Sequence, residues 1–185
     1  MNNILRNVLM RRSTSQLDIR PIQDEELMEI LEEGKMLSNA TRNQEWHFTV
    51  LQNRGLMKQL GASYEKMLAR VHGDIWGDPA GTGRILVESS LLLIISGHRD
   101  IKYAEDSANM VFGGMMLVAE KYGIGSCWLT SAPDLLRAPE TQKVVAQLSI
   151  PSGYEPLCVG VFGYKRALTP PHVLASADNI VNIVK

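Results

Sequence analysis

The stretch LLLIIS, residues 91–96, decides the class of fold that this sequence can adopt. Five apolar residues in a row have the length of a strand, and a strand without polar alternation is covered on both faces. A second run, LCVGVF at residues 157–162, predicts another buried strand. WHFTVL at residues 46–51 is rich in aromatic and β-branched residues and predicts a third. The sequence therefore predicts a buried sheet.

Helical segments are expected between these strands. Apolar residues recur at helical spacing in four of them, residues 2–10, 24–39, 55–70 and 106–122. Helices and strands interleave without regular crossover units, which predicts a single α+β domain over residues 1–185, with helices around a mostly antiparallel sheet. Apolar residues surround most of the helix at 106–122, so it is buried on more than one side, and a second subunit is one partner that could bury it.

The remaining segments are expected to be less regular. GIGSCW at residues 123–128 is interpreted as a turn, followed by a helical stretch to about residue 148. HGDIWGDPAGTGR, residues 72–84, is rich in Gly, Asp and Pro and predicts a long loop, which includes GTGR. Residues 180–184 are expected to add a short strand to a sheet edge.

Composition excludes several classes of function. The 185 residues are 45% hydrophobic and 21% charged, and 19 basic side chains face 20 acidic ones, a formal net charge of −1. Such a balance provides no field for nucleic acid or an anionic membrane. No apolar run approaches the ~20 residues of a membrane helix. Two cysteines form no disulfide framework, so a cytoplasmic location is expected, and the spacing of the four histidines predicts no metal site.

Two basic clusters are candidates for binding an anion. Arg11, Arg12 and Ser13 follow a predicted helix and can together bind a phosphate through charge-assisted hydrogen bonds. Lys165 and Arg166 follow a predicted strand directly. The alternative for each cluster is an ordinary basic surface turn. Sequence alone does not show whether the two clusters meet.

Two other features are interpreted as structural. Cys127 has no identifiable partner histidine, which favours a packed side chain over a nucleophile. GTGR at residues 81–84 lacks the GK[ST] ending of a phosphate-binding loop and is interpreted as flexible loop.

Four stretches, taken in order, resemble the signatures of the FMN-dependent nitroreductase family: RRSTS (11–15), LSNATRNQEWHFTV (37–50), AEKYGIGSCWLTSA (119–132) and LCVGVFGYKR (157–166). Together they span nearly the whole chain. The resemblance implies an α+β fold and an intertwined homodimer that exchanges its C-terminal strands. It also implies FMN bound at the subunit interface.

The resemblance also implies a set of cofactor contacts. Arg11 corresponds to the arginine that meets the FMN phosphate, and Arg12 and Ser13 to contacts of the isoalloxazine and ribityl groups. Lys165 and Arg166 correspond to basic residues that complete the phosphate site. A loop that reaches the flavin from the other subunit is matched by Ser38, Asn39, Ala40 and Arg42. Backbone N–H groups facing flavin N5, with side chains over one ring face, are matched by Trp128, Leu129, Thr130 and Ser131.

One expected cation is missing. Ser15 stands where the family usually has Arg or Lys, and a positive charge there favours reduced flavin, which is negative at N1 and O2. Arg84 resembles in position a lysine that some members direct at the flavin pyrimidine, and Arg42 stands where the family usually has Asn. We hypothesise that Arg84, Arg42 or both replace the missing cation. The alternative for Arg84 is a solvated loop arginine.

The resemblance implies an NAD(P)H oxidoreductase in which flavin N5 carries hydride to a nitroaromatic, a quinone or a similar electron-poor acceptor, with ping-pong kinetics. No catalytic side chain is assigned, because the cofactor supplies the chemistry. Two alternatives stay open. One is a specialised flavin reaction such as dehalogenation, azoline oxidation or flavin breakdown. The other is a degenerate member that acts as an FMN-binding sensor or an interaction module.

Overall fold

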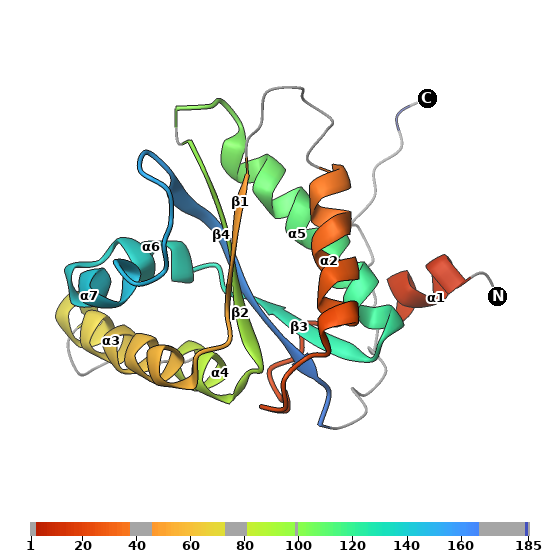
Figure 1. Cartoon of the computed structure of the whole chain (residues 1–185), viewed down its shortest axis with the longest axis horizontal. Coiled ribbons are helices and arrows are strands. Elements are labelled where there is room, and N and C mark those ends of the chain that lie inside the picture. Colours follow the sequence, from red (N-terminus) through yellow and green to blue (C-terminus); the bar gives the residue numbers. More distant parts are fainter. Residues whose placement is uncertain (1–2, 38–45, 73–80, 99, 167–183, 185) are drawn as a thin grey trace.

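The computed structural model describes residues 3–37, 46–72, 81–98, 100–166 and 184. Within them, strands form one sheet in which each strand is antiparallel to its neighbours (Figure 1). This confirms the predicted antiparallel sheet. In spatial order the strands are β1 (His47–Leu51), β2 (Leu91–Gly97), β4 (Glu155–Tyr164) and β3 (Ile124–Trp128).

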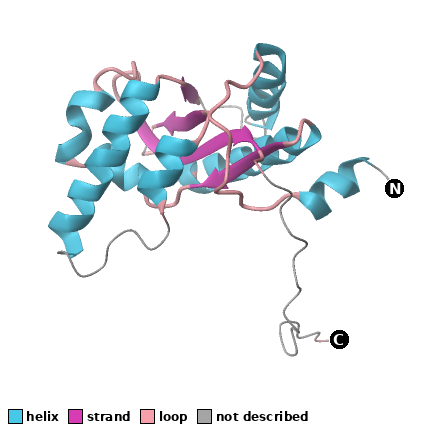
Figure 2. Cartoon of the chain, turned by 90° about the horizontal axis from the view of Figure 1, so that it is seen from below, coloured by secondary structure: helices cyan, strands magenta, loops and turns pink. Residues whose placement is uncertain are grey.

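Helices cover both faces of the sheet, so the molecule has three layers (Figures 1 and 2). One face carries α2 (Asp24–Leu37) and α5 (Ala104–Lys121), with α1 (Asn3–Met10) lying against α5 at the side of the molecule. The other face carries α3 (Arg54–His72), α4 (Thr82–Glu88), α6 (Ala132–Arg137), the 3-10 helix η3 (Pro139–Thr141) and α7 (Gln142–Val145).

The strand β2 lies at the centre of the hydrophobic core, as its apolar run predicts. All seven of its residues are buried. Leu92 and Ile94 contribute to the cluster beneath α3 and α6, whereas Leu91, Leu93 and Ile95 contribute to the cluster beneath α5. The alternation follows from the two-residue period of a strand, and a sheet with apolar residues on both faces needs helices on both.

Three local predictions are wrong. GIGSCW is a strand rather than a turn, because residues 124–128 pair with β4 along their whole length and only Gly123, at φ +69°, turns the chain. The helix expected up to residue 148 is broken at Pro139, where a proline cannot continue the α-helical ladder. The last three residues of the predicted loop, 82–84, belong to the helix α4, which extends to Glu88.

Two adjacent glycines on α5 have opposite surroundings. A Cβ on Gly114 would lie 2.1 Å from Leu37 Cδ1, so this glycine lets α2 approach closely. A Cβ on Gly113 would meet nothing within 4 Å, and Met110, one turn earlier, is 58% exposed. The helix is therefore packed against both the sheet and α2, and it leaves a third, apolar side open.

Two further expectations concern the C-terminal strand and membrane helices. The terminal strand predicted at residues 180–184 lies outside them, apart from Val184. Where the chain is described, no helix combines the length and the apolar character needed to cross a membrane.

Candidate functional site

The segments that carry the two basic clusters of the sequence meet along the β3 edge of the sheet. Residues 11–17 run beside β3: Ser13 pairs with Ser126, and the Thr14 amide donates a 2.8 Å hydrogen bond to the Ser126 carbonyl. Leu17 then pairs with Lys165, just past the end of β4. We call the region formed by residues 11–17, 123–131 and 165–166 the β3-edge site.

A glycine makes this close approach possible. A Cβ on Gly125 would lie 2.9 Å from Leu17 Cδ2, 3.0 Å from Lys165 Cγ and 3.1 Å from Thr14 Cβ. Three side chains from the two flanking segments therefore pack on the space that Gly125 leaves. A Cβ at this position would force these side chains to move apart.

The two neighbouring arginines have different environments. Arg12 Nη1 donates to the carbonyls of Leu9 and Arg11, both at 2.7 Å, and so caps the C-terminal end of α1. Its Nε is buried, and no partner for it lies among the described residues. Arg11, by contrast, places Nη1 3.9 Å from Met116 Sδ, a weak acceptor. The Arg11 guanidinium thus keeps most of its donor capacity.

Short polar side chains lie next to these arginines. Ser13 is exposed, and its hydroxyl donates to Cys127 Sγ at 3.3 Å. Ser15 is half-buried two residues further on. Cys127 is nearly buried on β3 and makes this contact as a packed thiol, as expected for a structural role.

The chain leaves β3 through residues 128–131. Trp128 is 41% exposed, a large aromatic surface at the sheet edge, and Thr130 is exposed as well. Leu129 is buried, and its amide donates to the Val159 carbonyl at 3.0 Å. The Ser131 hydroxyl lies 3.3 Å from the hydroxyl of Tyr64, which is buried and comes from α3. The turn is thereby fixed from both sides.

The second basic cluster divides as the first does. Lys165 Nζ lies 2.6 and 2.8 Å from the two carboxylate oxygens of Glu120, near the end of α5. Arg166 is exposed, and its amide donates to the Gln16 carbonyl at 3.2 Å. Each cluster therefore contains one cation whose side chain binds protein oxygens, Arg12 or Lys165, and one, Arg11 or Arg166, whose guanidinium has no oxygen acceptor among the described residues.

The structure does not test every predicted contact. Ser38, Asn39, Ala40 and Arg42 lie outside the described residues. Arg84 is exposed on α4, which packs against α3. Residues 82–84 of the expected flexible loop form the first turn of this helix. A role of Arg84 or Arg42 as replacement cation stays a prediction.

Tyr164, the last residue of β4, lies next to the β3-edge site. The Tyr164 hydroxyl donates to Glu26 and accepts a hydrogen bond from the Gln23 amide, and the Arg20 guanidinium lies 3.9 Å from the ring centroid. Burial and the nearby Glu26 carboxylate raise the pKa of Tyr164, so the phenol stays protonated and keeps donating. This network ties the start of α2 to the end of β4.

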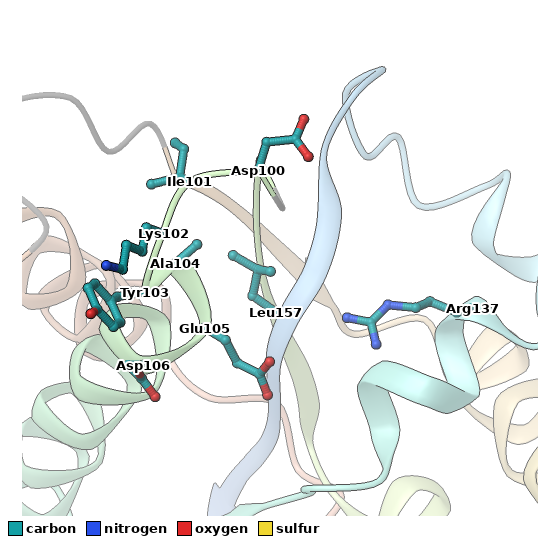
Figure 3. Close-up of a pocket in the computed structure, with 9 residues that line it drawn as sticks. All are labelled: Asp100, Ile101, Lys102, Tyr103, Ala104, Glu105, Asp106, Arg137 and Leu157. Carbon is teal, nitrogen blue, oxygen red and sulfur yellow. The ribbon is translucent and has the colours of Figure 1, made fainter.

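A separate cavity of about 340 Å³ opens at the N-terminal end of α5 (Figure 3). Glu105 extends into it from α5, and Arg137 extends from α6 on the opposite side. The Arg137 guanidinium is already bound to Asp134 at 3.0 Å and to the Pro156 carbonyl at 2.5 Å. None of the site residues predicted from the sequence lines this cavity.

The buried thiol of Cys158 is kept neutral. Burial, and secondarily the negative charge of Glu105, raises the pKa of Cys158 to about 12. A thiol in this state is no nucleophile near neutral pH. In the described part of the chain, no group of three metal-ligating side chains gathers either.

Sequence reasoning missed three residues at the β3-edge site: Tyr64, Met116 and Glu120. Each lies on a helix and contacts a residue of the site that is at least 45 positions away in the sequence. Only Glu120 carried a signal, a carboxylate in the stretch 119–132 that also holds the turn.

Solved structures with the same fold bind a flavin. A nitroreductase with bound FMN from Bacteroides fragilis superimposes with a TM-score of 0.82 at 23% identity, and one from Desulfitobacterium hafniense with a TM-score of 0.83 at 19% identity; both matches cover 100% of each chain. These likenesses confirm the predicted fold.

Sequence comparison agrees. The "Putative NADH dehydrogenase/NAD(P)H nitroreductase" of Archaeoglobus fulgidus is 24% identical, over 81% of this chain and 85% of the relative. The model of the nitroreductase family matches residues 8–164, which include the β3 edge, both arginines of the first cluster and the whole sheet. The chain belongs to the nitroreductase family and is therefore classed with the oxidoreductases.

Proposed function

We propose that this chain is an FMN-dependent NAD(P)H oxidoreductase that reduces a nitroaromatic, a quinone or a similar electron-poor acceptor. One observation carries the proposal. Residues 11–17, 128–131 and 165–166, which are far apart in the sequence, converge on one sheet edge. The FMN-bound neighbours of the same fold and the family match support it.

The donors at this edge suit FMN. Arg11 and Arg166 both have guanidinium groups directed to few or no protein acceptors among the described residues, and each can bind a phosphate through two parallel hydrogen bonds. The exposed Ser13 hydroxyl offers a polar contact, and Trp128 offers an aromatic surface for a planar ring. Bound FMN would supply the hydride chemistry, with N5 accepting from NAD(P)H and donating to the acceptor.

The chain itself would position the reactants. Residues 128–131 are held by the Tyr64 hydroxyl and by the Leu129 amide, and they would cover one side of the bound ring. Donor and acceptor would then share the remaining face and bind in turn. No side chain at the β3-edge site is required to transfer a proton, so we assign no catalytic residue.

We also propose that the chain acts as a homodimer. The third side of α5 exposes Met110 and leaves Gly113 open, and α1, which packs against α5, has Val8, Leu9 and Met10 each about half exposed. A second copy would bury this surface. It would also supply the loop at residues 38–42 that the family resemblance places on the partner's flavin. A cytoplasmic location remains the prediction from the sequence.

Anaerobic reduction tests the function. Purified protein is reconstituted with FMN, and NADH and then NADPH are added without oxygen while the flavin absorbance is followed. The proposal expects the flavin bands to disappear with one nucleotide or both, and to return when a quinone or nitroaromatic is added. Bands that persist with both nucleotides would favour a specialised or sensory flavoprotein. A protein that binds no FMN would refute the proposal that FMN is its cofactor.

Initial-rate kinetics test the order of binding. With both substrates varied, sharing of one face predicts parallel lines in double-reciprocal plots. Intersecting lines would show that donor and acceptor bind together, which contradicts that arrangement.

A further inference from the structure

The ion pair of Lys165 and Glu120 is the most buried one described in the molecule. The side chains are 17% and 9% exposed, and both carboxylate oxygens lie within 2.8 Å of the ammonium. A carboxylate that contacts the ammonium with both oxygens compensates its charge. Separation would leave a charge in a poorly solvated place, which is strongly unfavourable.

The same pair joins every segment of the β3-edge site. Lys165 pairs through its backbone with Leu17, and its amide donates to the Gly123 carbonyl at 3.4 Å. Its Cγ packs where Gly125 leaves room, beside Thr14. Glu120 fixes the other end of the side chain to α5. The ammonium is therefore anchored inside the protein, at the junction of the segments that carry Arg11 and Arg166.

A second lysine pair on the same helix provides a contrast. Lys121 lies 2.8 Å from Glu29, but both side chains are more than half exposed, and the hydrogen bonds of Lys121 among the described residues go to Glu29 and Tyr122, outside the β3-edge site. Exposed pairs of this kind contribute little to stability. The two pairs thus differ in burial and in location while their chemistry is the same.

We propose that Lys165 positions the phosphate-binding segments and is not itself a phosphate ligand: Glu120 compensates its charge, and Arg11 and Arg166 provide the positive charge that meets the phosphate. This inference rests on the proposed function. In the second cluster, Lys165 would then position the site and Arg166 would bind the phosphate.

Riboflavin provides the test, because it is FMN without the phosphate. The ratio of FMN to riboflavin affinity is measured for apoprotein by flavin fluorescence quenching. The variants are Lys165→Met, Glu120→Leu, the double variant of both, and Arg166→Met. Lys121→Met serves as the matched control for loss of a lysine on a neighbouring exposed pair. The double variant removes both charges together, so it keeps the test valid if a single variant does not fold.

The proposal expects Arg166→Met to lower the ratio about tenfold or more, as for loss of a charge-assisted contact. Each single variant of the pair should lower the ratio too, because an uncompensated buried charge displaces the segments. The double variant should return to within about threefold of the wild type, since two apolar residues restore the packing. Lys121→Met should leave the ratio unchanged.

Two results would overturn the proposal. If Lys165 binds the phosphate, the double variant stays as low as Arg166→Met, and Glu120→Leu raises the ratio by releasing the ammonium. If the pair only stabilises the fold, all three variants keep the wild-type ratio and lose thermal stability alone. A wild-type chain that binds neither flavin refutes the proposed function itself, which separates that failure from the other two.

Discussion

The two faces of the sheet are covered to different degrees. On the face of α3, α4, α6 and α7, Val71 is the one large apolar side chain among the described residues that is half exposed or more. The α2, α5 and α1 side exposes a series of them, namely Val8, Leu9, Met10, Met28, Met36 and Met110. One face is completed by the chain alone, and the other leaves apolar surface of the kind that marks an interface.

The candidate site lies at the incompletely covered side. Arg11 follows α1 directly and contacts Met116 of α5, so a guanidinium with only a weak protein acceptor is adjacent to the exposed helices. Both faces bury a hydrophobic cluster against the sheet. The difference between them indicates that the incompletely covered side is the one that adjoins the candidate site and leaves surface for the proposed partner.

The cores on the two faces of the sheet should contribute similarly to the free energy of unfolding. Truncation of one core side chain on each face is the prediction with the largest expected effect. Phe112 of α5 is fully buried against the sheet. Its ring centroid lies 5.4 Å from that of Phe162, and the ring packs over Gly160. We expect Phe112→Ala to lower the free energy of unfolding by about 3–5 kcal/mol. Urea denaturation measures it. Leu60→Ala, on the opposite face, should cost about 2–5 kcal/mol. A Phe112→Ala cost below 1 kcal/mol would mean that α5 is not docked.

The pKa of Cys158 predicts a pH dependence on the α5 face. Below pH 9.0, the ordinary value, the thiol is protonated in both states and adds no slope. Above it the unfolded chain releases a proton that the native chain holds to about pH 12, so the free energy of unfolding falls by about 1.4 kcal/mol per pH unit. Urea denaturation at pH 8, 9 and 10 measures the slope. Cys158→Ala should remove this part of it, and equal slopes would contradict the burial.

Two glycine substitutions compare the site with the open side of α5. Gly125→Ala should cost about 1–3 kcal/mol, because its methyl group would collide with Thr14, Leu17 and Lys165. Gly113→Ala meets open space in a helix and should stabilise a monomer by about 0.5–1 kcal/mol. Thermal unfolding distinguishes them. If both changes had the same sign, the contrast between the packed β3 edge and the open helix side would be wrong.

Introducing a charged side chain on either outer surface should have the smallest effect on stability of the changes proposed here. On the α5 side it should prevent association. Met110→Glu and Val71→Glu each replace an exposed side chain, so each should alter stability by no more than about 0.5 kcal/mol. Size-exclusion chromatography with light scattering should show that only Met110→Glu loses the proposed dimer. Dissociation caused equally by Val71→Glu would place the interface on the other face.

The sequence predicted the parts of the fold that local patterns determine. The run at residues 91–96 predicts a buried strand because its apolar character is continuous, and the helix expected over residues 24–39 is observed as α2 from Asp24 to Leu37. The strand at residues 124–128 was missed since Gly, Ser and Cys have little preference for a strand and its pairing with β4 decides the structure. Pro139 was a visible break in the expected helix and was not used.

The site could be predicted in composition but not in arrangement. The chemistry of Arg11 and Arg166 is readable from their side chains, whereas their convergence depends on pairings between positions some 150 residues apart. Which cation of each cluster is engaged inside the protein depends on the carbonyls at the end of α1 and on Glu120, and no local pattern reports those contacts.

Sedimentation velocity, recorded at both the protein and the flavin absorbance after addition of FMN, tests the central claim most directly. The account predicts that the flavin signal sediments with the protein as one species of twice the chain mass, with one FMN per chain. Flavin that stays at the meniscus while the protein sediments as a monomer would contradict both the site at the β3 edge and the partner that covers α5.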